Sequence, residues 1–497
     1  MTLEERRLIE KVQKKLIDDL PTEELEKALE QIKQLTKPKD KPLQLTTKVK
    51  IQPTKEQQQV LWILAENCRL IYYFANKERK EWWNQNKDLP KNQQDVAKKP
   101  TYNRQSAQLP KLKQKYPRYQ QNYSKTLQDT LKQLEADYKS FHALRRNGDK
   151  TAKPPRYKGK KYFTTIHYNQ KGFKIEGNKI TFNHFYPTKE TKKVDLTFEM
   201  EGKFDFVDKK VKQVTIFQAH KTKEFFLSVI YEPPIPSYRD NGIYQTIDQG
   251  VINLVVAVNS HAGKIISIKN KRVDKYWQQK ITEVQFKRDH CKKFSKRWYW
   301  YNDKLSKMIR KQANQQKDFQ HKTSKKMVEN TKANTIIIGD LNAKEMSHKE
   351  KGDKKNDKSR HRSMQNSGSI ARFARFLTYK AQKVGKKVIW ISERNSSKRC
   401  SYCMRKENRK LFDRIINCDC GLVIDRDSNG TVNIMQRFLA LLSLSQKRLV
   451  VRQRLLKDFR EKFFATHSQT SNESSSIFGV ERTRKKSNVS ENFLEVS

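Results

Sequence analysis

The spacing of apolar residues divides the chain into helical, strand-rich and mixed parts. Residues 1–44, 56–83 and 124–146 repeat apolar side chains every three or four positions, which predicts amphipathic helices. Between residues 163 and 232 apolar and polar side chains alternate, which predicts strands of a half-buried sheet. Pro233-Pro234-Ile235-Pro236 then predicts a linker, because proline interrupts both helices and strands.

After this linker, strand and helix patterns follow one another, which predicts an α/β fold. Short apolar runs have the length of buried strands, and longer amphipathic stretches have the length of helices. The expected strands are Tyr244–Asp248, Leu254–Val258 (in a hairpin), Thr335–Ile338 and Lys387–Ser392, with helices at Ile370–Val384 and from about Asn429. One further strand, Thr46–Ile51, is expected before the linker. The polar, basic residues 345–362 predict a loop, and the Ser- and Asn-rich residues 466–497 predict a disordered tail.

The N-terminal residues 1–44 carry their own helical pattern. Leu25, Leu29 and Ile32 recur at helical spacing among charged residues. Such a segment is either an oligomerisation helix or a solvated extension, and we favour the extension.

Charge points to the kind of partner. The 497 residues include 106 Lys or Arg and 54 Asp or Glu, which gives a formal net charge of +52. So many like charges repel one another unless a polyanion neutralises them, and nucleic acid releases its counterions when it does so. No apolar run has the roughly 18 residues of a membrane span, and Met1–Arg6 lacks the apolar core of a signal peptide. We therefore expect nucleic acid as the partner, and no membrane.

Four of the six cysteines lie within 21 residues, as two close pairs. Cys400 and Cys403 have the C-x-x-C spacing, and Cys418 and Cys420 have the shorter C-x-C spacing. Two such pairs joined by a short loop are typical of tetrahedral Zn²⁺ coordination. Disulfides are the alternative, and they are the weaker one because no secretion signal is present.

Carboxylates stand where predicted strands end and where the last predicted helix begins. Asp248 closes the first strand after the linker, Glu393 follows the last strand, and Asp425 and Asp427 precede the last helix. The carboxyl ends of parallel strands meet at one edge of a sheet, so these acids are expected to lie close together. Any one of them alone is more typical of a cap or a salt bridge. Together they suit Mg²⁺ or Mn²⁺, and two such ions can activate water and stabilise the leaving oxygen of a phosphodiester.

On these residues the chain resembles the TnpB nucleases of bacterial transposons and their eukaryotic and viral relatives, the Fanzor proteins, which are related to type V CRISPR effectors. Ile247–Val251 resembles the first RuvC motif, Ile336–Asn342 the second, Glu393–Cys403 the entry to a zinc ribbon, and Cys420–Gly430 its exit and the third motif. The resemblance covers most of residues 45–440. It implies a RuvC (RNase H-like) nuclease core with an inserted zinc ribbon, a β-barrel wedge domain and a helical recognition domain.

The chain departs from the family in its second motif. Many members carry Glu where this chain has Gly339, and the neighbouring Asp340 should face away because alternate strand residues point to opposite faces. Glu393 can reach the same edge from the next strand, and some members, including Fanzor proteins, resemble this arrangement. Asp427 is preferred over Asp425 because it directly precedes the Ser-Asn-Gly helix start, as the family's acid does. The resemblance thus implies a catalytic, Mg²⁺-binding (or Mn²⁺-binding) set of Asp248, Glu393 and Asp427, beside the Zn²⁺ ligands Cys400, Cys403, Cys418 and Cys420.

The resemblance also implies domain boundaries. These are an N-terminal helical extension (1–44), a wedge β-barrel (45–52 and 160–237), a helical recognition domain (53–159), a RuvC nuclease domain (241–396 and 425–465), a zinc ribbon (397–424) and a disordered tail (466–497).

The function that follows is RNA-guided DNA cleavage by a metal-dependent endonuclease, next to a short DNA motif. Its expected partners are a guide RNA and target double-stranded DNA, and the expected state is a monomer. A non-catalytic nucleic-acid-binding repressor, RNA-guided or generic, is one alternative, and a DNA-joining transposase is another. The expected location is the nucleus for a eukaryotic or viral host, and otherwise the cytoplasm or nucleoid.

Overall fold

The computed structural model describes most of the chain as two compact units. They comprise Met1–Lys39 with Ile235–Ser497, and Asp40–Pro234, so the predicted linker lies at the boundary between them. The described residues are 3–33, 42–90, 93–94, 96–185, 194–202, 206, 209–219, 223–261, 263–340, 370–409, 413–444 and 449–468. The predicted loop 345–362 and residues 469–497 of the predicted tail lie outside them. Within these ranges, no helix combines the length and the apolar character needed to cross a membrane.

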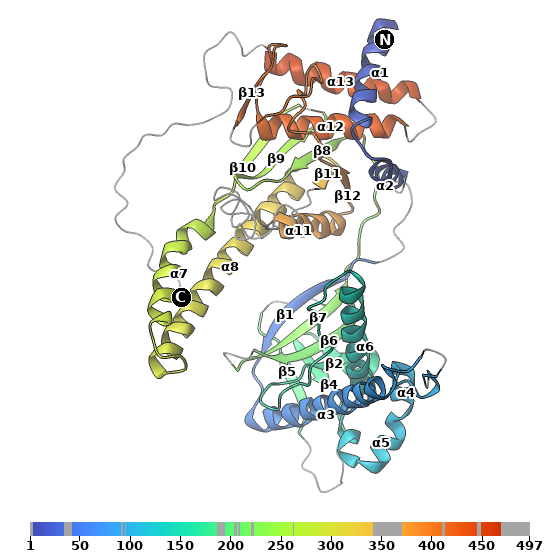
Figure 1. Cartoon of the computed structure of the whole chain (residues 1–497), viewed down its shortest axis with the longest axis vertical. Helices are drawn as coiled ribbons and strands as arrows, with labels where there is room; N and C mark the ends of the chain where they lie inside the picture. The colour runs from blue at the N-terminus through green and yellow to red at the C-terminus, as the bar shows by residue number, and fades with distance from the viewer. Residues whose placement is uncertain are drawn as a thin grey trace. The chain divides into compact units, whose positions relative to one another are not determined.

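The larger unit is built on a mixed five-stranded sheet. Its order is β10-β9-β8-β11-β12, with β8, β11 and β12 parallel and β9 antiparallel to both β8 and β10 (Figure 1). The strands are β8 (Tyr244–Asp248), β9 (Asn253–Asn259), β10 (Ile265–Lys269), β11 (Thr335–Asp340) and β12 (Lys387–Ser392). The predicted strands and the predicted hairpin are confirmed.

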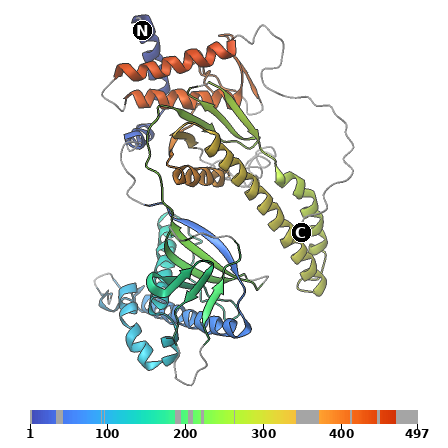
Figure 2. The same ribbon diagram turned by 180° about the vertical axis from the view of Figure 1, so that it is seen from behind.

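Helices cover both faces of this sheet. Apolar side chains of α12 pack on Tyr244, Ile337 and Ile391 of one face, while α8 and α11 pack on the other, with Ile338 among their contacts (Figure 1). Figure 2 shows α7 and α8 lying side by side. The helices are α7 (Val273–Asp289), α8 (Lys296–Asn330), α11 (Ile370–Lys383), α12 (Arg426–Leu444) and α13 (Leu449–Ser468), so the tail expected from residue 466 begins within a helix.

The N-terminal helices belong to the same unit. In α1 (Leu3–Ile17) and α2 (Thr22–Lys33), the apolar stripe is buried in the core that α12 forms. Gln13 Nε2 donates a hydrogen bond to Ser443 Oγ over 2.9 Å, and Gln31 Oε1 accepts one from the Trp390 N–H over 2.9 Å. The expectation of a solvated extension is wrong, because the apolar stripe that predicted the helices has a partner within the chain.

The smaller unit holds two antiparallel sheets and a set of helices. One sheet has the order β1-β7-β6-β2 and the other β3-β4-β5, and among the described strands the two do not close into a barrel. Thr54 caps α3 through a reciprocal capping box with Gln57. The elements are β1 (Leu45–Ile51), α3 (Lys55–Asn86), η1 (Val96–Lys98), α4 (Tyr102–Ala107), α5 (Leu109–Lys115), η2 (Pro117–Gln121), α6 (Ser124–Arg146), β2 (Ile166–Asn169), η3 (Gln170–Gly172), β3 (Phe173–Glu176), β4 (Lys179–Phe182), β5 (Leu196–Glu199), β6 (Lys210–Gln218) and β7 (Phe225–Glu232).

Candidate active site

The three predicted acids lie at one edge of the five-stranded sheet, on the face that α12 covers. Asp248 is the last residue of β8, and Glu393 directly follows β12. Residues an even number of positions apart in a strand share a face, so Asp248 shares the face of Tyr244, whose ring packs on Phe438 of α12. Asp427 lies in the first turn of α12. The edge predicted from the sequence is therefore the edge at which the fold brings these acids together.

Neighbouring carboxylates add to burial in raising the pKa of Asp248 and of Glu393. Burial, followed by the charge of Asp427, raises the pKa of Asp248 to about 7. Burial, followed by the charge of Asp248, raises the pKa of Glu393 well above its usual range. A Cβ on Gly430 of α12 would lie 3.0 Å from Asp248 Oδ2, so the helix backbone itself lies against this carboxylate. Such a group of buried carboxylates needs a cation to remain ionised together.

The carboxylate set fits divalent cations with oxygen ligands. Glu393 Oε1 is buried and has no hydrogen-bond partner among the described residues, which is costly unless a cation binds there. Although all three acids are described, their oxygens do not all lie within 4.8 Å of one another. Two ions do not require such a tight group, since each ion binds only some of the ligands. The ligand roles stay a prediction.

The raised pKa of Asp248 predicts a pH dependence. Because the folded state holds this proton up to about pH 7 and the unfolded state releases it near 3.8, the metal-free protein should lose stability as pH rises across that range. Thermal unfolding in a chelator measures this trend, and Asp248→Asn should flatten it. Mg²⁺ binding, which needs the ionised carboxylate, should strengthen as pH rises through about 7. An equal pH slope in Asp248→Asn would contradict this prediction.

Gly339 provides the space that Glu393 occupies. Ile338 pairs with Ile247, so Gly339 stands beside Asp248 in the next strand. A Cβ at Gly339 would lie 2.6 Å from both Cγ and Cδ of Glu393 and would overlap its carboxylate. The side chain of Glu393 therefore lies over Gly339 of the neighbouring strand.

The neighbouring acids have other roles. Asp425 Oδ1 accepts hydrogen bonds from the backbone N–H groups of Asp427 and Ser428, each over 3.0 Å, so it caps α12. The helix therefore begins at Arg426 rather than near Asn429, and Asp427 lies within the helix rather than before it. Asp340 is about half exposed and pairs with Lys27 over 3.5 Å.

Two side chains that the sequence did not single out hold Asp427. Asn253 Nδ2 donates a hydrogen bond to Asp427 Oδ2 over 2.8 Å, and Arg414 pairs with the same oxygen. The second oxygen of this carboxylate thus keeps its capacity as a ligand. Nothing in the residue pattern distinguished Arg414 from the many other basic residues.

A buried arginine fixes the backbone on both sides of Glu393. Arg437 of α12 donates hydrogen bonds to the carbonyls of Ser392 over 2.6 Å and Arg394 over 2.8 Å. Its guanidinium lies 3.7 Å from the carboxylate of Asp19, a residue of the turn that joins α1 to α2. Burial lowers the pKa of Arg437 to about 10. The helix that carries Asp427 therefore also fixes the segment that carries Glu393.

We expect Arg437→Met to destabilise the protein by about 3–5 kcal/mol, because it removes a buried guanidinium that donates hydrogen bonds to the carbonyls of Leu16, Ser392 and Arg394. Chemical denaturation measures this loss. Arg405→Met is the matched control, because Arg405 pairs with Asp419 at the surface, where an ion pair contributes at most about 1 kcal/mol. Equal stabilities of the two variants would show that the buried arginine is dispensable.

The four clustered cysteines form a second candidate metal centre. Their Sγ atoms all lie within 4.8 Å of one another, with Cys400 3.6 Å from Cys420 and Cys403 3.5 Å from Cys418. Four thiolates around a tetrahedral Zn²⁺ stand about 3.8 Å apart, so this donor set fits zinc. All four are free thiols, and the disulfide alternative is therefore wrong.

The ribbon that carries these thiols is attached to α12. Its strands β13 (Ile415–Asn417) and β14 (Val423–Asp425) pair antiparallel. Asn429 and Asn433 of α12 are buried and donate hydrogen bonds to the carbonyls of Arg399 over 2.8 Å and Ser396 over 2.7 Å. The same helix therefore anchors the cysteine ribbon and carries Asp427.

We expect the purified protein to hold one Zn²⁺ per chain and Cys400→Ser to lose it, because three thiolates leave the tetrahedron incomplete. Elemental analysis of the purified protein measures the metal content. Cys291→Ser is the matched control, because Cys291 is a half-buried free thiol outside the cluster. Unchanged zinc content in Cys400→Ser would contradict the assignment.

The mixed sheet, its covering helices and the attached ribbon define the class as a RuvC-like α/β fold. Three family models match the chain: "Cas12f1-like, TNB domain" over residues 371–434, "Probable transposase" over 232–350 and "Helix-turn-helix domain" over 43–88. A solved structure, a Cas12f1–sgRNA–target DNA complex, has a TM-score of 0.53 and 12% identity, and the match covers 79% of this chain and 98% of that one. This likeness shows the fold.

Curated relatives share one segment of this chain. TnpB-like proteins L79 and L770 of Acanthamoeba polyphaga mimivirus are each 33% identical over 143 residues, which is 29% of this chain and 26% of theirs. The chain thus spans about a quarter of the length of the curated relatives that it matches. In these matching segments and in its fold, the chain is therefore similar to TnpB-like proteins.

Proposed function

We propose that this protein is an RNA-guided, metal-dependent DNA endonuclease. The observation that carries the proposal is the group of neighbouring carboxylates at one sheet edge, of which Glu393 Oε1 is buried without a hydrogen-bond partner among the described residues. That edge is the one from which a RuvC-like fold presents its acids. The relocated glutamate at 393 supports a Fanzor-like member of the family.

The chain's own residues would position the metal ions and the carboxylates that bind them. Asp248, Glu393 and Asp427 would hold Mg²⁺ or Mn²⁺, which supplies the charge that activates water and stabilises the leaving oxygen of a phosphodiester. Asn253 and Arg414 hold one oxygen of Asp427, and its other oxygen would serve as the metal ligand. The cap from Asp425 and the backbone of Gly430 keep the first turn of α12 against Asp248.

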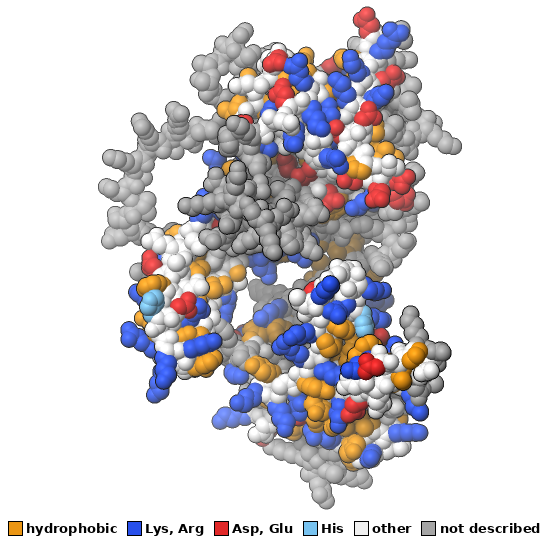
Figure 3. Space-filling model, in the orientation of Figure 1, with side chains coloured by type: hydrophobic (Ala, Val, Ile, Leu, Met, Phe, Trp, Pro, Cys, Tyr) orange, Lys and Arg blue, Asp and Glu red, His pale blue; other side chains and the backbone are white. Residues whose placement is uncertain are grey.

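Charge supports RNA and DNA as the partners. The net charge is +52, and Figure 3 shows Lys and Arg spread over both units on its visible face. The Cas12f1 chain with the similar fold was solved with an sgRNA and target DNA. We propose that a bound RNA selects the target by base pairing while the protein reads a short flanking motif. We further propose that one chain acts alone, in the nucleus of a eukaryotic or virus-infected cell or in a bacterial cytoplasm.

The test is to express the protein with its flanking genomic DNA, purify it through a high-salt wash, and sequence the RNA that stays bound. We expect one discrete RNA with a constant fold and a variable end. Loaded with that RNA, the protein should cut a matching duplex in the presence of Mg²⁺ and spare a mismatched one. A heterogeneous mixture of RNAs, or none, would favour a generic nucleic-acid-binding repressor.

The description "Probable transposase" over residues 232–350 makes DNA joining the second candidate. The same cleavage assay distinguishes the two, because a transposase yields strand-transfer products of new length. Cut ends without joined products would support the nuclease.

A further inference from the structure

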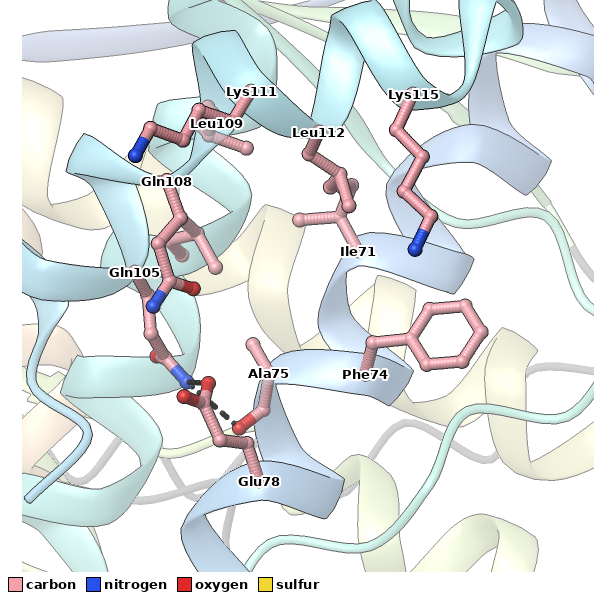
Figure 4. Close-up of a pocket in the computed structure, with 11 residues that line it drawn as sticks. Ile71, Phe74, Ala75, Glu78, Gln105, Gln108, Leu109, Lys111, Leu112 and Lys115 are labelled. Atoms are coloured by element: carbon pink, nitrogen blue, oxygen red, sulfur yellow. Dashed lines mark hydrogen bonds between the residues drawn. The ribbon is translucent and has the colours of Figure 1, made fainter. Parts of the chain in front are cut away.

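A pocket in the smaller unit lies outside every site described above. It has a volume of about 400 Å³ and opens between α3, α4, α5 and α6 (Figure 4). Its floor is apolar and buried, formed by Ile71, Ala75, Leu109 and Leu131. A pocket of this size accommodates a small planar ring with its attached groups.

One wall of the pocket is polar. Gln105 Nε2 donates hydrogen bonds to the Ala75 carbonyl over 3.0 Å and to Glu78 Oε2 over 2.7 Å, which fixes the carboxylate at the wall (Figure 4). Gln108 also lines the pocket, and its side chain does not cap α5. This wall presents an acceptor and an amide to any ring that enters.

The opposite side and the mouth are aromatic and basic. Phe74 is 53% exposed although it lies on α3 beside the apolar floor. Lys111 and Lys115 of α5 reach toward the mouth from the other helix (Figure 4). Neither lysine forms an ion pair within the described part of the chain. A ligand that stacks on Phe74 and carries an anion would satisfy both features.

We propose that this pocket binds one unstacked nucleotide of a single-stranded nucleic acid. The base would stack on Phe74, its hydrogen-bonding edge would face Glu78 and Gln108, and the adjoining phosphates would lie near Lys111 and Lys115. An acceptor carboxylate favours bases with an exocyclic amino group over thymine or uracil. The apolar side chain of a peptide would leave the polar wall and both lysines without a partner, so a nucleotide fits better. The proposal does not depend on DNA cleavage, since its residues and those of the acid site belong to different units.

The test is photocrosslinking of the full chain, freed of nucleic acid by high salt and kept in a chelator. The probes are 12-residue oligocytidylates, one of DNA and one of RNA, each with a central 5-iodocytosine. We expect a crosslink to the peptide that contains Phe74, and competition by unlabelled oligo(dC) more strongly than by oligo(dT). The relative yield of the two probes shows whether RNA or an unpaired DNA strand is the source.

Variants make the result specific. Phe74→Ala should weaken the site-specific crosslink about 5- to 100-fold, as expected for the loss of one stacking contact, while Trp83→Ala, a change of an equally exposed aromatic on the same helix, should not. Glu78→Gln should keep the crosslink but lose the preference for cytosine. Unchanged thermal unfolding shows that each variant is folded. Crosslinks confined to other peptides, or an unchanged crosslink in Phe74→Ala, would overturn the proposal.

Discussion

Asp248→Asn is expected to abolish Mg²⁺-dependent DNA cleavage, by on the order of a thousand-fold or more, while the bound RNA is retained. Asparagine keeps the shape of the side chain but removes the charge that the cations need. Because the carboxylate is buried beside two other acids, removing it also relieves repulsion. The metal-free variant should therefore be at least as stable as the parent. Loss of activity without loss of stability separates a catalytic role from a structural one.

The matched control is Asp340→Asn. This carboxylate ends the neighbouring strand but is about half exposed and pairs with Lys27. We expect this variant to cut DNA at nearly the parental rate in the same assay. If Asp248→Asn cleaves as fast as Asp340→Asn, the nuclease proposal fails and RNA-guided or generic binding becomes the function to test.

Elements with a strong apolar period were predictable nearly to the residue. The helix 124–146 and the strand 244–248 were expected with the bounds that the structure has. In the helix, apolar side chains recur at the helical period. The strand instead has four consecutive buried residues, and its short length between turn residues predicted it. The shared sheet edge of the acids was also predictable, because parallel strands end at the same edge of a sheet.

Partners across the sequence were not predictable. The pattern of α1 and α2 shows that one face of each helix is apolar, but it does not say that α12 covers that face. Arg437 is one of 106 basic residues. It can be buried because it donates hydrogen bonds to carbonyls about 45 positions away in the sequence. The helix α12 begins at Arg426 rather than near Asn429, because Asp425 caps it ahead of its first apolar residues. Such contacts depend on tertiary packing, which one sequence does not display.

Gly339→Ala is expected to reduce cleavage by roughly a hundred-fold with little change in thermal stability. The added methyl group would overlap both Cγ and the carboxylate of Glu393, so the whole glutamate side chain has to swing away from Gly339. Rotation removes an acid from the sheet edge, so activity should fall while folding does not. Cleavage rates and unfolding midpoints of the same preparations measure both effects.

A double-mutant cycle tests whether the alanine acts through Glu393. Adding Gly339→Ala to Glu393→Ala should cause no further loss, since the carboxylate that the methyl group displaces is already absent. The double variant Gly339→Glu/Glu393→Ala should regain activity over Glu393→Ala, because a glutamate on β11 would place its carboxylate in the space that Glu393 leaves. The cycle could instead show additive losses for Gly339→Ala and Glu393→Ala, and no recovery in Gly339→Glu/Glu393→Ala. Those two results together would mean that Glu393 has only a structural role. The cation site would then have to be sought with Asp248 and Asp427 alone.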